Sequence, residues 1–162
     1  MISSSWPDGP LSVATTTIDD CRVVQLSKIH NGRSGNLTVV QPGANFPFEI
    51  KRAYYLYDVP SGATRGGHAH RQLYQLLVAA SGSIEVVLDD GENKRTVFMN
   101  RPDVGLLVVP GIWRELQEFS SGAICLVMAS ESFDEADYIR TYAAFENVKN
   151  EKTGQASVNF HD

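Results

Sequence analysis

The sequence has no apolar run that approaches the roughly 20 residues needed to span a bilayer. It has only two cysteines, Cys21 and Cys125, and both lie beside apolar residues, which favours buried free thiols over a disulfide. Clusters of basic residues are lacking, and the formal net charge of -5 argues against a general nucleic-acid binder. The first residues lack the basic start and apolar stretch of a signal peptide. We therefore expect a cytoplasmic protein without membrane or nucleic-acid partners, in which a few pocket arginines are still sufficient to hold one anionic ligand.

The sequence also has few patterns typical of an amphipathic helix. It consists mainly of short apolar segments separated by turn residues. The expected strands are Arg22–Leu26, Gly35–Val40, Lys51–Val59, Leu73–Ala80, Ser83–Leu88, Arg95–Met99, Gly105–Val109 and Ala123–Ala129. Such a succession predicts an all-β sandwich or barrel. The stretch Asp134–Phe145 has an acidic start that suits a helix, but it fits a strand equally well, so we expect a short C-terminal extension of either kind.

The length of 162 residues suits one domain. We expect an N-terminal extension at residues 1–20, a barrel domain at residues 21–146 and a polar, loosely held C-terminal tail at residues 147–162.

Two histidines separated by one residue are the most informative feature of the sequence. In a strand, His68 and His70 would point to the same face, with Cα atoms about 7 Å apart. If that face lines a barrel, two imidazoles enter one cavity; the alternative is a pair of exposed histidines on a polar face. Because imidazoles titrate near neutrality, one can hold a proton while the other accepts one. Such a pair suits proton abstraction beside a carbonyl and return of the proton at a neighbouring carbon.

The pattern G-x5-H-x-H-x4-Q-x6-G at residues 62–82 resembles the first motif of the cupin superfamily, and residues 105–114 resemble the second. The resemblance implies a cupin, or jelly-roll, barrel. Metal-binding cupins carry a glutamate where this chain has Gln75, and a histidine near the position of Trp113 and Arg114. An amide is a poor ligand for divalent metals and a guanidinium cannot coordinate one. We therefore expect a site without metal.

More closely, the chain resembles the dTDP-4-keto-6-deoxyglucose 3,4-ketoisomerases, the family with WxcM-like domains. The matching stretches are Phe48–Val59, Arg65–His70, Leu88–Gly91, Trp113 and Ala129–Arg140. The two most specific are R-G-x-H-A-H and S-E-x-x-D-E-x-D-Y-I-R, and together the matches span roughly residues 23–145.

This resemblance implies an isomerase of deoxysugar and polysaccharide biosynthesis that acts on a dTDP-linked keto-deoxysugar. The C4 ketone acidifies the hydrogen at C3, its removal gives an enediolate, and protonation at C4 completes the migration of the ketone. The family's catalytic histidines match His68 and His70, and either residue fits either role. No cofactor is implied, because hydrogens and electrons are only redistributed within the sugar. The resemblance also implies a homodimer.

Substrate-binding side chains are expected on the strands around the histidines. Arg52 and Tyr54 share one face of their strand, where they would meet a phosphate and a sugar hydroxyl. Arg65 is a further candidate for the diphosphate, and Trp113 for the thymine or the sugar face. The full set of candidates is Arg52, Tyr54, Arg65, Gln75, Trp113 and Arg114. The aromatic members fit core packing equally well.

Three other functions are compatible with the sequence. Glu115 could complete a two-histidine, one-carboxylate iron site in a dioxygenase-like, metal-dependent cupin. A sugar-nucleotide epimerase and a non-catalytic sugar-binding cupin are the other two. The acidic cluster Glu131, Asp134, Glu135 and Asp137 is interpreted as a solvated loop or helix start, because no glycine-punctuated metal loop accompanies it.

Overall fold

The computed structural model describes residues 11–43 and 46–154. Its strands are β1 (Arg22–Gln25), β2 (Ser27–His30), β3 (Asn36–Val39), β4 (Arg52–Leu56), β5 (Arg65–His70), β6 (Gln75–Ser81), β7 (Ile84–Asp89), β8 (Lys94–Met99), β9 (Val104–Val108), β10 (Trp113–Gln117), β11 (Ile124–Ala129) and β12 (Tyr138–Ile139). The helices are the short 3-10 turns η1 (Ile18–Asp20), η2 (Gly32–Ser34) and η3 (Glu135–Asp137), and the α-helix α1 (Tyr142–Gly154). The predicted all-β class is confirmed.

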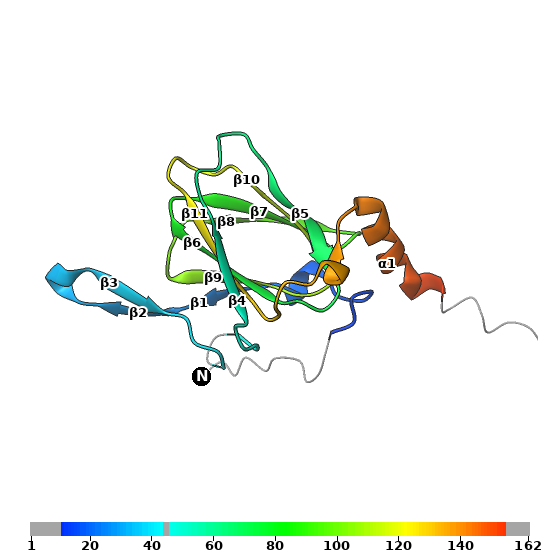
Figure 1. Cartoon of the computed structure of the whole chain (residues 1–162), viewed down its shortest axis with the longest axis horizontal. Coiled ribbons are helices and arrows are strands. Elements are labelled where there is room, and N and C mark those ends of the chain that lie inside the picture. The colour runs from blue at the N-terminus through cyan, green and yellow to red at the C-terminus, as the bar shows by residue number, and fades with distance from the viewer. Residues whose placement is uncertain (1–10, 44–45, 155–162) are drawn as a thin grey trace, which may run out of the picture.

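The strands form two five-stranded antiparallel sheets that face each other (Figure 1). The first sheet has the order β1-β9-β6-β11-β4 and the second the order β12-β5-β10-β7-β8. Strands β2 and β3 pair only with each other and extend away from the two sheets as a hairpin (Figure 1). Because each large sheet is hydrogen-bonded as a separate unit, the expected barrel takes the form of a sandwich whose sheets are not closed on each other.

The apolar core lies between the two sheets. Successive side chains of a strand point to opposite faces, and those that point inward form this core. Leu77 and Val127 of the first sheet belong to the same buried cluster as Val86 and Leu116 of the second. Burial of each such side chain contributes about 1.5–3 kcal/mol. At one end of this interior the lining changes to buried polar side chains, namely His70, Gln75 and Arg114. The core thus positions a polar pocket between two rigid sheets.

Part of the outer face of each sheet is covered by another segment of the chain. Leu26 and Phe46 are buried against the first sheet. On the second sheet, Phe145 and Val148 of α1 pack against Trp113. The helix therefore runs to Gly154 and crosses the boundary expected at residue 146, because Val148 gives it an apolar contact with the sheet that the polar composition of this region does not suggest.

Residues 11–20 are held against the domain by hydrogen bonds and close packing. The Thr16 hydroxyl donates to the carbonyl of Pro110 at 2.7 Å, and the Ile18 N–H donates to Asp90 Oδ2 at 3.0 Å. Gly111 has a φ of 79°, and a Cβ there would lie 2.2 Å from the carbonyl oxygen of Val13. Residues 11–20 of the expected extension therefore pack on the domain, while residues 1–10 and 155–162 lie outside the described residues.

Both cysteines are buried and free, as the sequence predicts. Of the helices in the described ranges, none combines the length and apolar character that a membrane crossing requires.

Candidate active site

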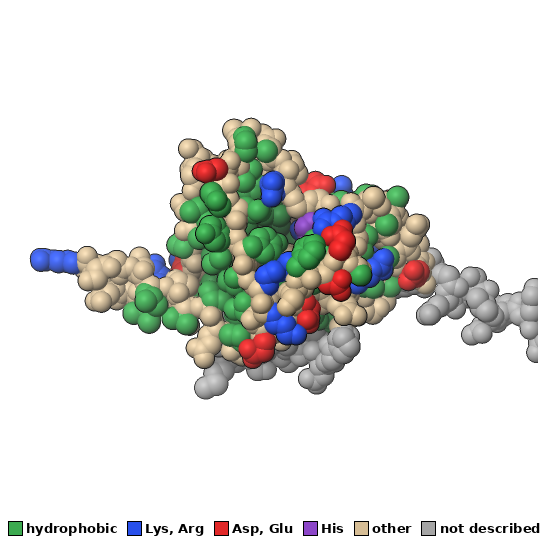
Figure 2. Space-filling model, viewed as in Figure 1, with side chains coloured by type: hydrophobic (Ala, Val, Ile, Leu, Met, Phe, Trp, Pro, Cys, Tyr) green, Lys and Arg blue, Asp and Glu red, His purple; other side chains and the backbone are tan. Residues whose placement is uncertain are grey.

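The histidine pair lies on the inner face of β5. The two rings are 4.8 Å apart between centroids and meet edge to face. The His70 side chain is fully buried, and His68 is half-buried beside it. Figure 2 shows a small area of histidine surface among charged side chains of both signs on this face of the molecule. The two imidazoles are therefore packed against each other in the interior rather than displayed on a polar strand face.

A bulge in β5 determines which residues share this face. His68 pairs with Arg114 on β10, whereas the next pair along joins Arg65 to Leu116, so three steps on β5 match two on β10. The extra residue is accommodated at Gly66, whose φ is 75°. Since paired residues point to the same side of a sheet, the bulge brings Arg65 to the face of His68, at the exposed rim of the interior.

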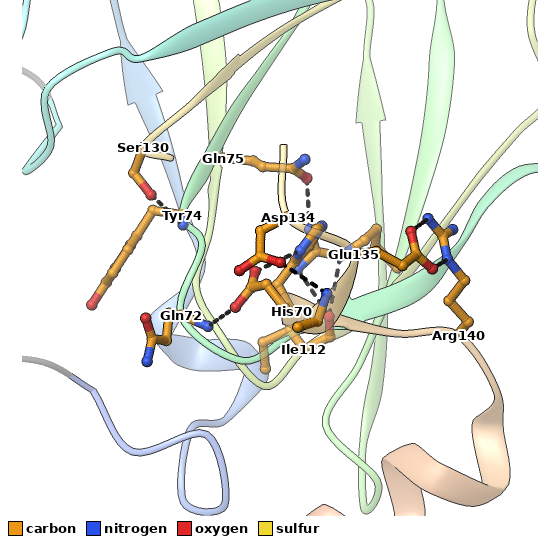
Figure 3. A network of polar contacts seen from close by, with 12 residues as sticks. His70, Gln72, Tyr74, Gln75, Ile112, Ser130, Asp134, Glu135 and Arg140 are labelled. Carbon is orange, nitrogen blue, oxygen red and sulfur yellow. Dashed lines mark hydrogen bonds and ion pairs between the residues drawn. The ribbon is translucent and has the colours of Figure 1, made fainter. Parts of the chain in front are cut away.

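Arg114 is the most deeply buried charge of the interior. Its Nε and Nη2 donate to the carbonyl of Ile112 at 3.1 and 3.0 Å, and its Nη1 donates to Gln75 Oε1 at 2.6 Å. The Gln75 amide donates in turn to the Tyr54 hydroxyl at 3.0 Å. Figure 3 shows Gln75, Ile112 and His70 within one network of polar contacts. The bonds connect the two sheets across the interior, and they bring three predicted site residues together.

The interior keeps both imidazoles neutral. Burial, with the positive charges of Arg114 and Arg140 added to it, lowers the pKa of His68 to about 3. Burial is also the main cause that lowers the pKa of His70, and Arg114 and the neighbouring His68 lower it further. Arg114 itself remains a cation at neutral pH, although burial lowers its pKa to about 10. The site thus presents two neutral bases beside a fixed positive charge.

Several polar atoms of the site are buried without a partner among the described residues. They are Nε2 of His68, Nε2 of His70, and Nε and Nη2 of Arg52. The Arg52 guanidinium lies over the rings of Tyr54 and Phe133, at 5.5 and 5.6 Å from their centroids. Each buried polar atom left unpaired costs about 1–3 kcal/mol, so these atoms are the ones that a bound ligand would satisfy.

Two side chains that the sequence analysis did not place at the site also belong to it. Asp137 Oδ2 lies 3.0 Å from His70 Nδ1, and its carboxylate is therefore directed at the site rather than at solvent. The Tyr138 ring lies 5.1 Å from the His68 ring and 4.4 Å from the His70 ring. Both residues arrive because β12 pairs with the end of β5, a long-range contact that the acidic composition of the segment concealed.

The rest of the acidic cluster matches the solvated loop that the sequence predicts. Asp134 accepts the Ala136 N–H at 3.0 Å and begins η3. Glu135 is exposed and paired with Arg140, while Glu131 is exposed and paired with Lys51.

Trp113 is not brought to the histidines. Residues one apart on β10 point to opposite faces, so Trp113 lies on the outer face while Arg114 lies on the inner one. Its ring packs against Tyr142 and Phe145 of α1, at 5.4 and 5.8 Å between centroids. The proposed contact of Trp113 with thymine or sugar is therefore corrected to core packing under the helix.

Glu115 shares this outer face and accepts the Trp113 indole N–H at 3.2 Å. It cannot join His68 and His70 in a metal site, because the sheet separates them. In the parts of the chain that the structure describes, no three His, Cys, Asp or Glu side chains are grouped so as to hold a metal ion.

Two facing antiparallel sheets, with a histidine pair and a buried arginine on their inner faces, define a cupin-type enzyme. The family described as "FdtA: WxcM-like, C-terminal" matches residues 19–150, and the chain belongs to this family. The TDP-4-oxo-6-deoxy-alpha-D-glucose-3,4-oxoisomerase of Aneurinibacillus thermoaerophilus is 43% identical over 124 residues, which cover 76% of this chain and 88% of the relative.

Solved structures agree with this assignment. A 3,4-ketoisomerase from Helicobacter canadensis has a TM-score of 0.78 at 40% identity, covering 81% of this chain and 98% of its own. A histidine-to-asparagine variant of the 3,4-ketoisomerase QdtA from Thermoanaerobacterium thermosaccharolyticum, in complex with TDP-4-keto-6-deoxyglucose, has a TM-score of 0.79 at 34% identity and covers 82% and 95%. The predicted family and the predicted enzyme class, a sugar 3,4-ketoisomerase, are confirmed.

Proposed function

We propose that this chain converts TDP-4-keto-6-deoxyglucose to its 3-keto isomer, with His68 and His70 transferring the protons. The observation that carries the proposal is the pair of neutral imidazoles on one interior face, whose buried Nε2 atoms have no partner among the described residues. The substrate is the one named for the relative from Aneurinibacillus thermoaerophilus and the one bound to the QdtA variant. Such a sugar has a hydrogen beside a ketone, which is what a buried neutral base can remove.

In the proposed reaction the composition of the sugar does not change, because one proton is removed from C3 and one is delivered to C4. One imidazole takes the proton from C3, and the electron pair of that C–H bond forms the C3–C4 double bond of an enediolate. The C3 hydroxyl loses its hydrogen as its oxygen becomes the new ketone, and the former C4 ketone oxygen becomes a hydroxyl. A proton delivered to C4 from the imidazole pair completes the balance. No oxidant or reductant is required.

Buried positive charge supports the same mechanism. The enediolate carries a negative charge on the two oxygens, and Arg114 holds a fixed positive charge that lowers the pKa of both imidazoles, so its field acts where the reaction takes place. Fixed charge in an interior that excludes water is the most effective means of stabilising such an intermediate. Arg52, with two unpaired buried nitrogens, and Arg65, at the rim, are the proposed partners of the diphosphate. Tyr54 and Gln75 are proposed to contact the sugar from the opposite sheet.

Metal-independent catalysis is part of the proposal. It is supported by Gln75, whose oxygen accepts from Arg114 and whose amide nitrogen donates to Tyr54, and by Glu115, which lies on the opposite side of the sheet. A dioxygenase-like function would need a third ligand, and the residues that the structure describes do not supply one beside the two histidines.

We also propose that the chain acts in the cytoplasm as a homodimer. The hairpin of β2 and β3 stands away from the body, and its Ile29 and Leu37 are exposed, as is Val23 on the edge strand β1. Apolar residues presented in this way suit contact with a second copy. Light scattering of the purified protein would give twice the chain mass if the proposal holds and the chain mass itself if it fails.

Incubation with TDP-4-keto-6-deoxyglucose, followed by carbon NMR, tests the function. Migration of the ketone from C4 to C3 is the expected result, and it should survive treatment with a chelator. A product that keeps the C4 ketone but changes configuration at C3 or C5 would indicate an epimerase instead. Binding without any turnover would indicate a sugar-binding cupin.

A further inference from the structure

Asp137 is fixed in place by four hydrogen bonds, two from its side chain and two from its backbone. Its Oδ1 accepts the Gln72 N–H at 2.7 Å, and its Oδ2 lies 3.0 Å from His70 Nδ1. Its carbonyl accepts the Arg71 N–H at 2.9 Å, and its own N–H donates to the Asp134 carbonyl at 3.1 Å. The carboxylate is therefore held between the turn that follows β5 and the 3-10 turn η3, with one oxygen directed at the imidazole.

This geometry determines which nitrogen of His70 carries the hydrogen. An ionised carboxylate only accepts hydrogen bonds, so the contact with Oδ2 requires a hydrogen on Nδ1. A neutral imidazole has one hydrogen on its two nitrogens, and burial keeps His70 neutral. The Nε2 atom then carries a bare lone pair, and it is the nitrogen that is buried on the inner face with no partner in the described part of the chain.

We propose that Asp137 is a positioning residue that holds His70 in the Nδ1–H tautomer, so that the Nε2 lone pair faces the sugar. The proposal rests on the proposed function for its catalytic consequence. When His70 takes a proton, the imidazolium gains a hydrogen bond to a negative charge, which offsets part of the effect of burial. Among the described residues no carboxylate bonds to His68, which contacts His70 and Tyr138, so the two imidazoles are not equivalent.

Other charged groups act on His70 from the surrounding elements. Arg114, Arg52 and Arg140 all disfavour its protonated form, as does His68. Against these four, Asp137 is the acidic side chain in direct contact with the ring. Its removal should therefore affect both the tautomer and the ease with which His70 accepts a proton.

The variant Asp137→Asn is the sharpest test, because it keeps the size and the acceptor for the Gln72 N–H while it removes the charge. Its amide can donate to Nδ1, which would move the ring hydrogen to Nε2. Nitrogen-15 NMR of the imidazole rings reads the tautomer directly, without any turnover. We expect the Nδ1–H form of His70 in the wild-type protein and loss of that preference in the variant.

Turnover supplies the second readout. Asp137→Asn should reduce kcat on the order of 10²-fold with a KM within about threefold, because the substrate contacts remain. Asp137→Glu, which restores the charge, should recover part of kcat and the Nδ1–H signature. Asp134→Asn is the matched control in the same loop, and it should change neither the tautomer nor kcat.

An Nε2–H tautomer in the wild-type protein would overturn the proposal, as would an Asp137→Asn variant with wild-type tautomer and kcat. The two readouts also separate this proposal from the function. If the tautomer changes as expected but the wild-type protein does not isomerise the sugar, Asp137 positions His70 and the proposed substrate is wrong.

Discussion

Gln75 and Arg114 are joined across the sandwich by a 2.6 Å hydrogen bond from the guanidinium Nη1 to the amide Oε1. Because both side chains are buried, replacing Gln75 by Leu leaves Nη1 and the Tyr54 hydroxyl without a partner. Leaving buried polar groups unpaired costs about 1–3 kcal/mol, and more when one is charged. We expect Gln75→Leu to lower the free energy of unfolding by at least about 2 kcal/mol in urea denaturation.

Gln117→Leu provides the matched control for this change. Gln117 donates to Glu85 at 3.1 Å near the surface, where water can replace it, so its loss should cost under about 1 kcal/mol. Equal losses for the two variants would contradict the account of the buried network. A double variant with Tyr54→Phe should be less destabilised than the sum of its parts, since the two residues share one bond.

The bulge at Gly66 predicts a difference between two neighbouring glycines. At Gly66 a side chain would meet a positive φ and lie 3.1 Å from Leu116 Cδ1, whereas at Gly67 the nearest atom would be at 3.6 Å, an ordinary contact. Gly66→Ala should cost about 1–2 kcal/mol and reduce turnover, because straightening the bulge rotates His68. Gly67→Ala should be within about 0.5 kcal/mol of wild type. Chemical denaturation and kcat of both variants check this, and a tolerated Gly66→Ala would speak against the bulge.

Trp113 should matter for stability rather than for substrate binding. Its indole is only 8% exposed and packs against α1, so Trp113→Ala should cost about 3–5 kcal/mol. The folded fraction of the variant should retain the wild-type KM, because the indole lies on the face opposite His68. Phe98→Ala, which removes an aromatic ring that is 60% exposed on β8, is the control and should be nearly neutral. A KM that rises tenfold or more in Trp113→Ala, with stability unchanged, would restore Trp113 to the binding site.

The two buried imidazoles predict that stability falls with acid. Their pKa values are lowered in the folded protein, to about 3 for His68, while an unfolded histidine titrates near 6.5. Their contribution is complete above pH 6.5 and is lost as the pH falls below that value, because the unfolded chain takes up the protons first. The slope is at most about 1.4 kcal/mol per pH unit for each histidine.

Urea denaturation between pH 7.5 and 5 measures this slope, in a window above the range in which carboxylates titrate. His70→Asn should make the slope shallower, whereas His30→Asn should not, because His30 is exposed on the hairpin. A free energy of unfolding that stays level over this window would show that the imidazoles are solvated.

Local pattern in the sequence was sufficient for much of the fold. Alternation and turn residues place β7 and β8, because each strand is set by its own residues and by a tight turn. The strands β2, β5 and β10 are not among the expected strands, although the shared face of the two histidines presupposes a strand at residues 68–70. Strand β10 carries Trp113, Arg114 and Glu115 in succession, and its residues read as polar because one face holds a buried guanidinium rather than apolar side chains.

The part of the site that depends on the spacing of residues within one strand could be predicted from the sequence. His68 and His70 share a face because they are two apart, and this follows from strand geometry alone. Arg65 reaches that face only through the bulge, and Asp137 only through the pairing of β12 with β5. Both depend on contacts between distant segments. The side of the sheet on which Trp113 lies depends equally on the register of β10, which the motif does not specify.

Proton transfer by the paired imidazoles is tested most directly by proton NMR of TDP-4-keto-6-deoxyglucose in deuterated water, with the wild-type protein and with His68→Asn and His70→Asn. The wild-type protein should move the ketone to C3 and place solvent deuterium at C4. Both variants should remain folded and react about 10²–10⁴-fold more slowly, while His30→Asn should react at the wild-type rate. Wild-type rates in both histidine variants, or a ketone that never leaves C4 in the wild-type reaction, would contradict the account.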